Sequence, residues 1–245
     1  MPLPGKTTSP APKLDAVLDA IGTDIISGAM ATGEKFTLQD LSDRFNISRT
    51  VAREAMRALE QLRLVTSSRR VGITVLAPTY WAVFDESIIR WRLADPASRA
   101  KQLLSLTQLR IAVEPIAARA MARHGSAESK KRLRRLAETI TDLGTQGRGD
   151  TDEFLDAVIS FHTLLLTAST NEMFATLVST IAATYTGEAT YLERRATPST
   201  QVLKGHHDLA EAIAAGDFNA AERAATAILD EARQKILISE GFRRA

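Results

Sequence analysis

Apolar residues recur every three or four positions over most of this 245-residue chain, and one short segment interrupts that spacing. Such spacing places the apolar side chains on one face of a helix. The interruption covers residues 64–76, where β-branched residues stand on both sides of Ser68, Arg69 and Arg70, as in a β-hairpin. Helical spacing resumes after Pro78. The chain is therefore predicted to be mainly α, with a small hairpin in its N-terminal third.

Three helices are predicted before the hairpin, over residues 13–28, 38–45 and 49–62. Thr37 and Ser48 are suited to cap the second and third helices, because their side-chain oxygens can accept from the first free backbone amides. Asn46 between them suits a left-handed turn. Two helices joined by so short a turn form a helix-turn-helix, and the hairpin that follows would be its wing.

The same pattern suggests how the chain divides into domains. Residues 1–12 are rich in Pro, Ser and Thr, so we expect a disordered arm. Residues 13–77 are predicted to form a winged helix-turn-helix domain, with the boundary near residues 77–80. Residues 78–245 are predicted to form an all-α antiparallel bundle of six or seven helices, because the helical segments are long and their connections short. Among these segments, residues 82–94 and 99–123 are expected to be separated by Pro96, and residues 171–194 are expected to form one helix.

Composition restricts the classes of function. The chain has no cysteine, which excludes disulfides, thiolate metal sites and a catalytic thiol. The N-terminal residues lack the apolar run of a signal peptide, and no stretch approaches the roughly 20 apolar residues that span a bilayer. We therefore expect a cytoplasmic protein with no membrane partner. The net charge of +2 is too small to indicate a partner by itself.

Charge is concentrated around the third predicted helix. Between residues 44 and 70 the chain has seven arginines and two acidic residues. The N-terminal end of such a helix enters the major groove of DNA, so its first polar residues are predicted to contact bases and phosphates. These residues are Ser48, Arg49, Thr50 and Arg53. At the tip of the wing, the predicted contacts are Arg69, Arg70 and Gly72.

The alternative for these arginines is a solvated helix face. Arg57, for example, is expected to lie too far along the helix to contact DNA and could pair with Glu54 or Glu60. The combination of turn, cap, basic helix and basic wing favours double-stranded DNA as the partner.

This region resembles the GntR family of transcriptional regulators. The stretch ISRTVAREAMRALEQLRLV and the following RRVGITVLAP are similar to the family's helix start, helix core and wing. The resemblance implies a DNA-binding regulator and adds Gln39, on the second helix, to the predicted contacts. Two departures are small: Asn46 replaces a common Gly, and Ala52 shifts the usual Val.

Four polar residues lie on apolar helix faces of the second domain. Arg110 and Glu114 are four residues apart on one predicted helix, while His162 and His206 lie on two others. Taken singly, each is explained by an ion pair or a hydrogen bond in the core. Converging in one place, they would form an effector site, in which Arg110 clamps a carboxylate and the other three bind hydroxyls.

The pattern FH, ASTN and HHDLAEAIAAGDFNAAE resembles the FCD ligand-binding domain of the FadR subfamily of GntR regulators. Members of that subfamily often bind a divalent metal through one Asp and three His. By this resemblance His162 and His206 are retained ligands, whereas Val158 and Ile228 stand in the places of the other two. Two imidazoles do not complete the usual shell of four ligands, so we do not expect a tightly held metal.

The predicted effector is therefore a small organic acid bound by protein groups. The segments WAVFDESIIRWRLADP and LRIAVEPIAARA resemble the galactonate-responsive branch of these regulators, which implies a sugar acid. We expect a homodimeric repressor, not an enzyme, that binds an inverted-repeat operator and is modulated by this acid.

Two other functions fit parts of the sequence. A metal-assisted hydrolase or lyase would use His162 and His206 to hold an ion and Glu114 as the base, but no HExxH pair and no Gly-rich phosphate loop accompany them. The other is an architectural DNA-binding protein whose bundle serves only to form the dimer.

Overall fold

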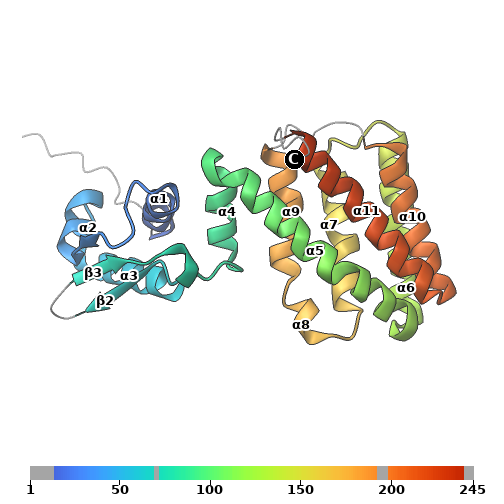
Figure 1. Cartoon of the computed structure of the whole chain (residues 1–245), viewed down its shortest axis with the longest axis horizontal. Coiled ribbons are helices and arrows are strands. Elements are labelled where there is room, and N and C mark those ends of the chain that lie inside the picture. Colours follow the sequence, from blue (N-terminus) through green and yellow to red (C-terminus); the bar gives the residue numbers. More distant parts are fainter. Residues whose placement is uncertain (1–13, 69–71, 192–197, 240–245) are drawn as a thin grey trace, which may run out of the picture. The chain divides into compact units, whose positions relative to one another are not determined.

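The computed structural model describes residues 14–68, 72–191 and 198–239 and divides the chain into two compact units (Figure 1). The division falls between Ala97 and Ser98. The predicted fold class is confirmed: the structure is mainly helical, with a small antiparallel sheet in the first unit. Within the described ranges, no helix is both long and apolar enough to cross a bilayer.

The first unit contains the predicted winged helix-turn-helix. Its elements are α1 (Leu14–Ser27), β1 (Lys35–Phe36), α2 (Leu38–Phe45), α3 (Arg49–Gln61), β2 (Val65–Ser68), β3 (Gly72–Val75), the 3-10 helix η1 (Pro78–Tyr80) and α4 (Glu86–Ala94). The strands form an antiparallel sheet in the order β1-β3-β2. The two-residue strand β1 was not predicted, because a single buried side chain, Phe36, produces no alternating pattern.

The predicted caps of the helix-turn-helix are confirmed. The Thr37 hydroxyl accepts from the backbone amide of Asp40, whose carboxylate accepts in return from the amide of Thr37, so the two ends of the first turn close a capping box. The Ser48 hydroxyl accepts from the amide of Val51 at the start of α3. Between these helices Asn46 adopts the left-handed conformation, with φ 50° and ψ 49°. Local sequence therefore fixes the angle at which α2 leads into α3.

Helix α4 belongs to the first unit. The indole Nε1 of Trp91 and the guanidinium of Arg90 both donate to Asp19 on α1, at 2.9 and 2.7 Å. The ring of Trp91 lies directly against Gly22, where a Cβ atom would come within 2.5 Å of it. The division between the units therefore lies about twenty residues after the boundary that was predicted from the end of the hairpin pattern. The prediction differed because helical spacing does not show which unit a helix packs against.

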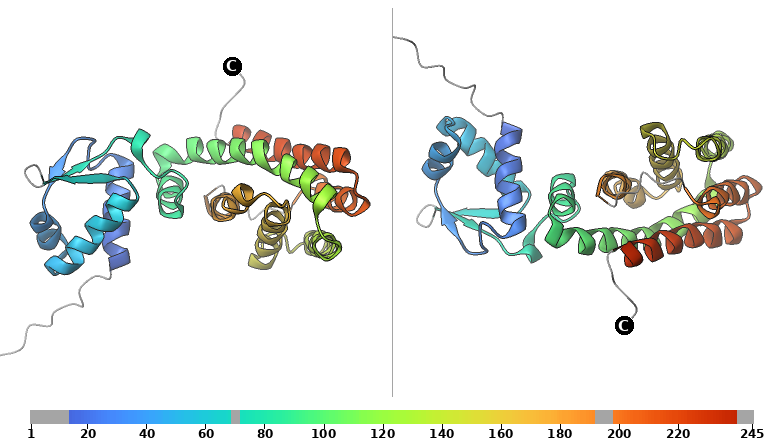
Figure 2. Two further views of the ribbon diagram at one scale, coloured as in Figure 1. Left: turned by 90° about the horizontal axis from the view of Figure 1, so that it is seen from below. Right: turned by 90° about the horizontal axis from the view of Figure 1, so that it is seen from above.

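The second unit is a bundle with a large apolar core. Its described helices are α5 (Pro96–His124), α6 (Ala127–Thr145), α7 (Asp152–Thr167), α8 (Glu172–Ala175), α9 (Val178–Tyr191), α10 (Thr200–Ala215) and α11 (Phe218–Ser239). Figure 2 shows α5 and α11 running side by side, and an ion pair of 2.7 Å between Arg119 and Glu222 joins them. Phe161 and Leu165 on α7 are fully buried at the centre of the core.

Two helix boundaries differ from the prediction. Pro96 was expected to separate two helices, but it begins α5, since the first helical position needs no amide hydrogen. Residues 171–194 were expected to form one helix, whereas the structure has the short α8 and then α9. The continuous apolar spacing across Thr176 and Leu177 concealed this break.

The contact between Gly22 and Trp91 supports a test of how α4 is attached. Substitution Gly22→Ala raises helix propensity in α1 but forces a methyl group into the indole ring, so we expect a net loss of about 1–2 kcal/mol of stability. Thr23→Ala, at an exposed position of the same helix, should change stability by less than about 0.5 kcal/mol. Urea unfolding of the two variants measures the difference; equal stabilities would contradict the packing of α4 on α1.

Candidate DNA-binding surface and effector pocket

Helix α3 has one buried face and one exposed face. Ala52, Ala55 and Leu59 are fully buried and pack into the core of the first unit. Arg49 and Arg53, on the other side, are exposed. Because the buried face fixes the rotation of the helix, the arginine-bearing face is held toward solvent. The capped N-terminal end of α3 thus presents cationic side chains in the arrangement that a major groove accommodates.

The structure brings two of the predicted DNA contacts together. Arg49 donates from Nη2 to the side-chain oxygen of Gln39 on α2, at 3.1 Å, and Gln39 donates in turn to Asp43, at 2.8 Å. Ser48 and Thr50, beside Arg49, are exposed as well. The adjacent ends of α2 and α3 therefore form one polar surface, which a prediction based on α3 alone does not show.

Glu60, one of the two acidic residues that could pair with Arg57, is engaged elsewhere. The carboxylate of Glu60 accepts from the backbone amide of Ser67, at 2.9 Å, and so ties α3 to β2. Arg44 pairs with Asp24 on α1, at 2.5 Å. Both contacts anchor the helix-turn-helix to its surroundings without covering Arg49 or Arg53.

The wing gives Gly72 an internal role. Its φ of +87° is unfavourable for other residues, and a Cβ atom would lie 2.9 Å from the backbone oxygen of Phe36. The glycine is thus explained by the pairing of β3 with β1, and its contact with DNA stays a prediction. Arg69 and Arg70 lie outside the described residues.

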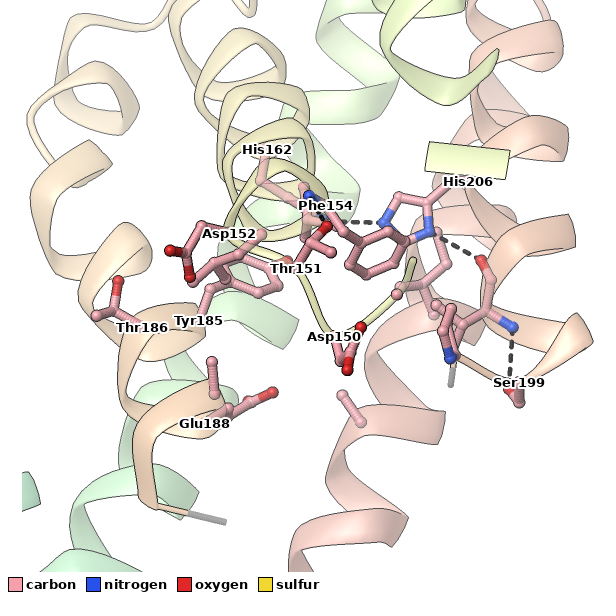
Figure 3. Close-up of a pocket in the computed structure, with 18 of the residues that line it drawn as sticks. Asp150, Thr151, Asp152, Phe154, His162, Tyr185, Thr186, Glu188, Ser199 and His206 are labelled. Carbon is pink, nitrogen blue, oxygen red and sulfur yellow. Dashed lines mark hydrogen bonds between the residues drawn. The ribbon is translucent and has the colours of Figure 1, made fainter. Parts of the chain in front are cut away.

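The second unit contains a cavity of about 600 Å³ between its helices (Figure 3). Three of the four residues predicted to bind an effector line this cavity: Arg110, His162 and His206. They come from α5, α7 and α10, so residues almost a hundred positions apart converge on it. The predicted convergence of these polar groups is therefore what the structure shows.

A chain of polar contacts connects these residues in the core. Arg110 donates from Nε to Glu114 Oε1, at 2.7 Å, and His162 donates from Nδ1 to Glu114 Oε2, at 2.6 Å. His162 Nε2 lies 3.3 Å from Nε2 of His206, whose Nδ1 donates to the carbonyl oxygen of Val202, at 2.8 Å. Glu114 itself is not among the residues that line the cavity. With both of its oxygens engaged, it positions Arg110 and His162 from behind the cavity wall.

The pKa values of Glu114 and His206 in this chain of contacts are both lowered, but for different reasons. Burial raises the pKa of Glu114, but the charges of Arg110 and His162 outweigh it and hold the pKa at about 2. Burial and, to a smaller extent, the neighbouring His162 lower the pKa of His206 to about 3. His206 is therefore neutral at pH 7. Because its proton is on Nδ1, its Nε2 is an acceptor.

Sequence analysis missed two members of the cluster, Tyr185 and Glu188 on α9. Arg110 donates from Nη2 to the Tyr185 hydroxyl and lies over its ring, 4.0 Å from the centroid. Nη1 of Arg110 lies 3.7 Å from Glu188 Oε1. The spacing of three between Tyr185 and Glu188 places them on one helix face, but only the packing of α9 shows that this face meets Arg110.

One donor of the buried guanidinium remains available. Nη1 of Arg110 makes no hydrogen bond with any residue that the structure describes, although the side chain is only 1% exposed. A buried N–H group without an acceptor costs about 1–3 kcal/mol. A ligand that enters the cavity with a carboxylate or hydroxyl oxygen can recover this free energy.

The donor set does not fit a metal centre. Val158 and Ile228 line the cavity at the positions where the family resemblance places two further ligands, and both are apolar and buried. Among the described residues, no group of three or more His, Asp or Glu side chains is arranged to hold an ion. Two imidazoles alone leave the usual shell of four incomplete.

The lowered pKa of His206 predicts how stability depends on pH. Folded His206 stays neutral down to about pH 3, whereas unfolded His206 takes up a proton near its ordinary value of 6.5. The unfolded state therefore binds more protons below pH 6.5, and stability falls as the pH falls. Between pH 8 and pH 5 this one group should contribute a loss of about 2 kcal/mol.

The variant His206→Gln should remove that contribution, so its free energy of unfolding should fall less between pH 8 and pH 5 than that of the wild type. His207→Gln is the matched control, because the side chain of His207 stands next to His206 in the sequence but is exposed. Denaturant unfolding at the two pH values measures both. An unchanged pH dependence in His206→Gln would show that His206 is not held neutral in the core.

Comparison with known proteins agrees with the geometry of both units. Residues 13–75 match the bacterial regulatory proteins of the gntR family, and residues 105–231 match the FCD domain. The galactonate operon transcriptional repressor of Escherichia coli (strain K12) is 24% identical over 227 residues, which cover 91% of this chain and 96% of that protein. The HTH-type transcriptional regulator YieP of the same organism is 25% identical, over 94% of this chain and 98% of YieP.

A solved structure supports the fold. It is that of Lar, which controls the expression of the Listeria monocytogenes agr system; it is 14% identical, covers 96% of this chain and 99% of its own, and has a TM-score of 0.57. The two matched regions together cover the winged helix-turn-helix and the helical bundle. The chain therefore belongs to the GntR family of bacterial regulatory proteins and carries an FCD domain in its C-terminal half.

Proposed function

We propose that this transcriptional regulator is a homodimeric, cytoplasmic repressor that binds an inverted-repeat operator and is released from it by a small organic acid. The observation that carries the proposal is the exposed arginine face of α3, held outward because the opposite face is buried. The similarity to a protein named as a galactonate operon repressor supports repression as the mode of action.

The physical basis of operator binding is the spacing of two recognition helices. In a dimer both must enter successive major grooves, about 34 Å apart, and a change in their separation loses contacts on one side. An effector can cause that change only if it binds one arrangement of the dimer more tightly than the other.

Helix α5 offers a route from the cavity to the DNA-binding unit. It carries Arg110 and begins at Pro96, so that only Asp95 lies between it and the end of α4 at Ala94. The 14 residue-to-residue steps from Pro96 to Arg110 span about 21 Å as one helix. A ligand that engages Arg110 would thus act on an element that continues directly into the junction between the units.

Operator binding can be tested on two arginines of the same helix. Arg53→Ala should weaken binding at least roughly tenfold and reduce the dependence of log affinity on log salt by about 1, because one phosphate or base contact is lost. Arg57→Ala should change affinity less than about threefold, since Arg57 lies one turn farther from the N-terminal end of α3.

The measurement is a gel shift with a duplex selected by the wild-type protein from a random-sequence library. Selection of no palindromic sequence by the wild-type protein would contradict the operator proposal, as would equal losses in the two variants.

Effector control can be tested by removing the buried charges together. Arg110→Ala alone would leave the Glu114 carboxylate buried without its cation, so the double variant Arg110→Met/Glu114→Gln is preferable. We expect this variant to bind the operator like the wild type but to stay bound in the presence of organic acids. Release of the double variant by the same acid at the same concentration would overturn the role of Arg110 as anchor.

A further inference from the structure

We propose that the effector is a monocarboxylic acid with an apolar body, bound by protein groups without a metal ion. This inference rests on the proposed function, since it names the class of acid that the same cavity takes. It differs from the sugar acid that the family resemblance implies, and it follows from three properties of the cavity: its wall, its charges and its donor set.

Most of the wall beside the histidines is apolar. Val158 lies one turn before His162 on α7, and Phe154 lies one turn before Val158. Ile228 of α11 also lines the cavity and packs so closely against α10 that a Cβ atom at Gly205 would come within 2.7 Å of it. An acid whose carboxylate reaches the polar end therefore places its body among these hydrocarbon side chains.

A polyhydroxylated body is poorly matched to such a wall. Each hydroxyl group transferred from water to a site without a partner costs free energy, whereas an alkyl or aryl body gains from the same transfer. The side chains of Phe154, Val158 and Ile228 offer no hydrogen-bonding atom. Four serine and threonine hydroxyl groups also line the cavity, but each already donates to an oxygen of the protein; they belong to Thr151, Thr186, Thr190 and Ser199. The wall thus selects for an apolar body.

The charges around the cavity limit the effector to one negative charge. Asp150, Asp152 and Glu188 line the cavity, as Figure 3 shows, and Glu114 stands behind it. Among the described residues that line the cavity, Arg110 is the one arginine or lysine, and Glu114 already pairs with it. A second carboxylate or a phosphate on the effector would therefore meet these acidic side chains, and the described part of the lining offers it no further cation.

The donor set indicates that the carboxylate binds the protein directly. Nη1 of Arg110 is a donor without a hydrogen bond to the described residues, and it belongs to a fully buried side chain that lines the cavity. A guanidinium can bind a carboxylate without any ion between them. By the family resemblance, Val158 and Ile228 stand where two further ligands would bind a metal ion together with the two imidazoles, and neither side chain can coordinate one.

The inference is tested with the full-length protein in buffer containing EDTA. Titration calorimetry compares three probes: 4-methylpentanoate for an apolar monocarboxylate, D-galactonate for a sugar acid and succinate for a dicarboxylate. We expect 4-methylpentanoate to bind at least roughly tenfold more tightly than either of the others, with no change when Zn²⁺ or Mn²⁺ replaces EDTA.

A substitution that keeps the shape of the wall separates polarity from folding. Val158→Thr exchanges a methyl group for a hydroxyl and should weaken the binding of 4-methylpentanoate roughly tenfold. Val83→Thr, at a position 39% exposed and outside the cavity, should leave binding unchanged. Thermal unfolding without ligand checks that both variants fold.

The outcomes distinguish the inference from the proposed function. Tighter binding of D-galactonate or succinate, or binding that requires added metal, overturns the apolar monocarboxylate while an organic-acid effector stands. Equal affinity of wild type and Val158→Thr for 4-methylpentanoate also overturns it. Binding of none of the three probes, by a protein that still binds its selected operator, overturns the inference and the effector part of the proposed function together.

Discussion

The ion pair between Arg110 and Glu114 is the interaction around which the second unit is organised. It is buried within α5, and its two ends reach His162 on α7 and Tyr185 on α9. Removing one partner of such a pair typically costs about 3–5 kcal/mol, because the other charge stays buried. A single substitution at the polar end of the cavity therefore leaves a buried charge without its partner, whereas a single substitution in the apolar wall does not.

In the first unit, burial of one face of α3 sets the direction of the arginines on its other face. Helix α3 must expose arginines, and it can do so in a fixed direction because Ala52, Ala55 and Leu59 hold its other face in the core. Asn46 and the cap at Ser48 fix where this helix begins. The DNA-binding surface is thus a consequence of packing on the side away from DNA, and Gln39 joins it through its contact with Arg49.

Residue spacing predicted some of the contacts in the candidate site but not others. Arg110 and Glu114 could be paired in advance, since residues four apart share a helix face. Tyr185 and Glu188 could not, because the break between α8 and α9 and the packing of α9 on Arg110 depend on contacts between distant segments. For the same reason Glu114 was expected in contact with the effector, but its oxygens are held by Arg110 and His162 and it does not line the cavity.

The sequence by itself determined the helical class, the caps, the helix-turn-helix with its wing and four of the polar residues that face the bundle core. These features follow from interactions within a few residues, which the order of amino acids specifies directly. Only the tertiary structure decided that α4 packs with the first unit, that Glu114 and Glu188 both lie beside the buried guanidinium of Arg110 and that the histidines stand beside an apolar wall. Those features depend on which helix faces meet, and that is set by the packing of the whole core.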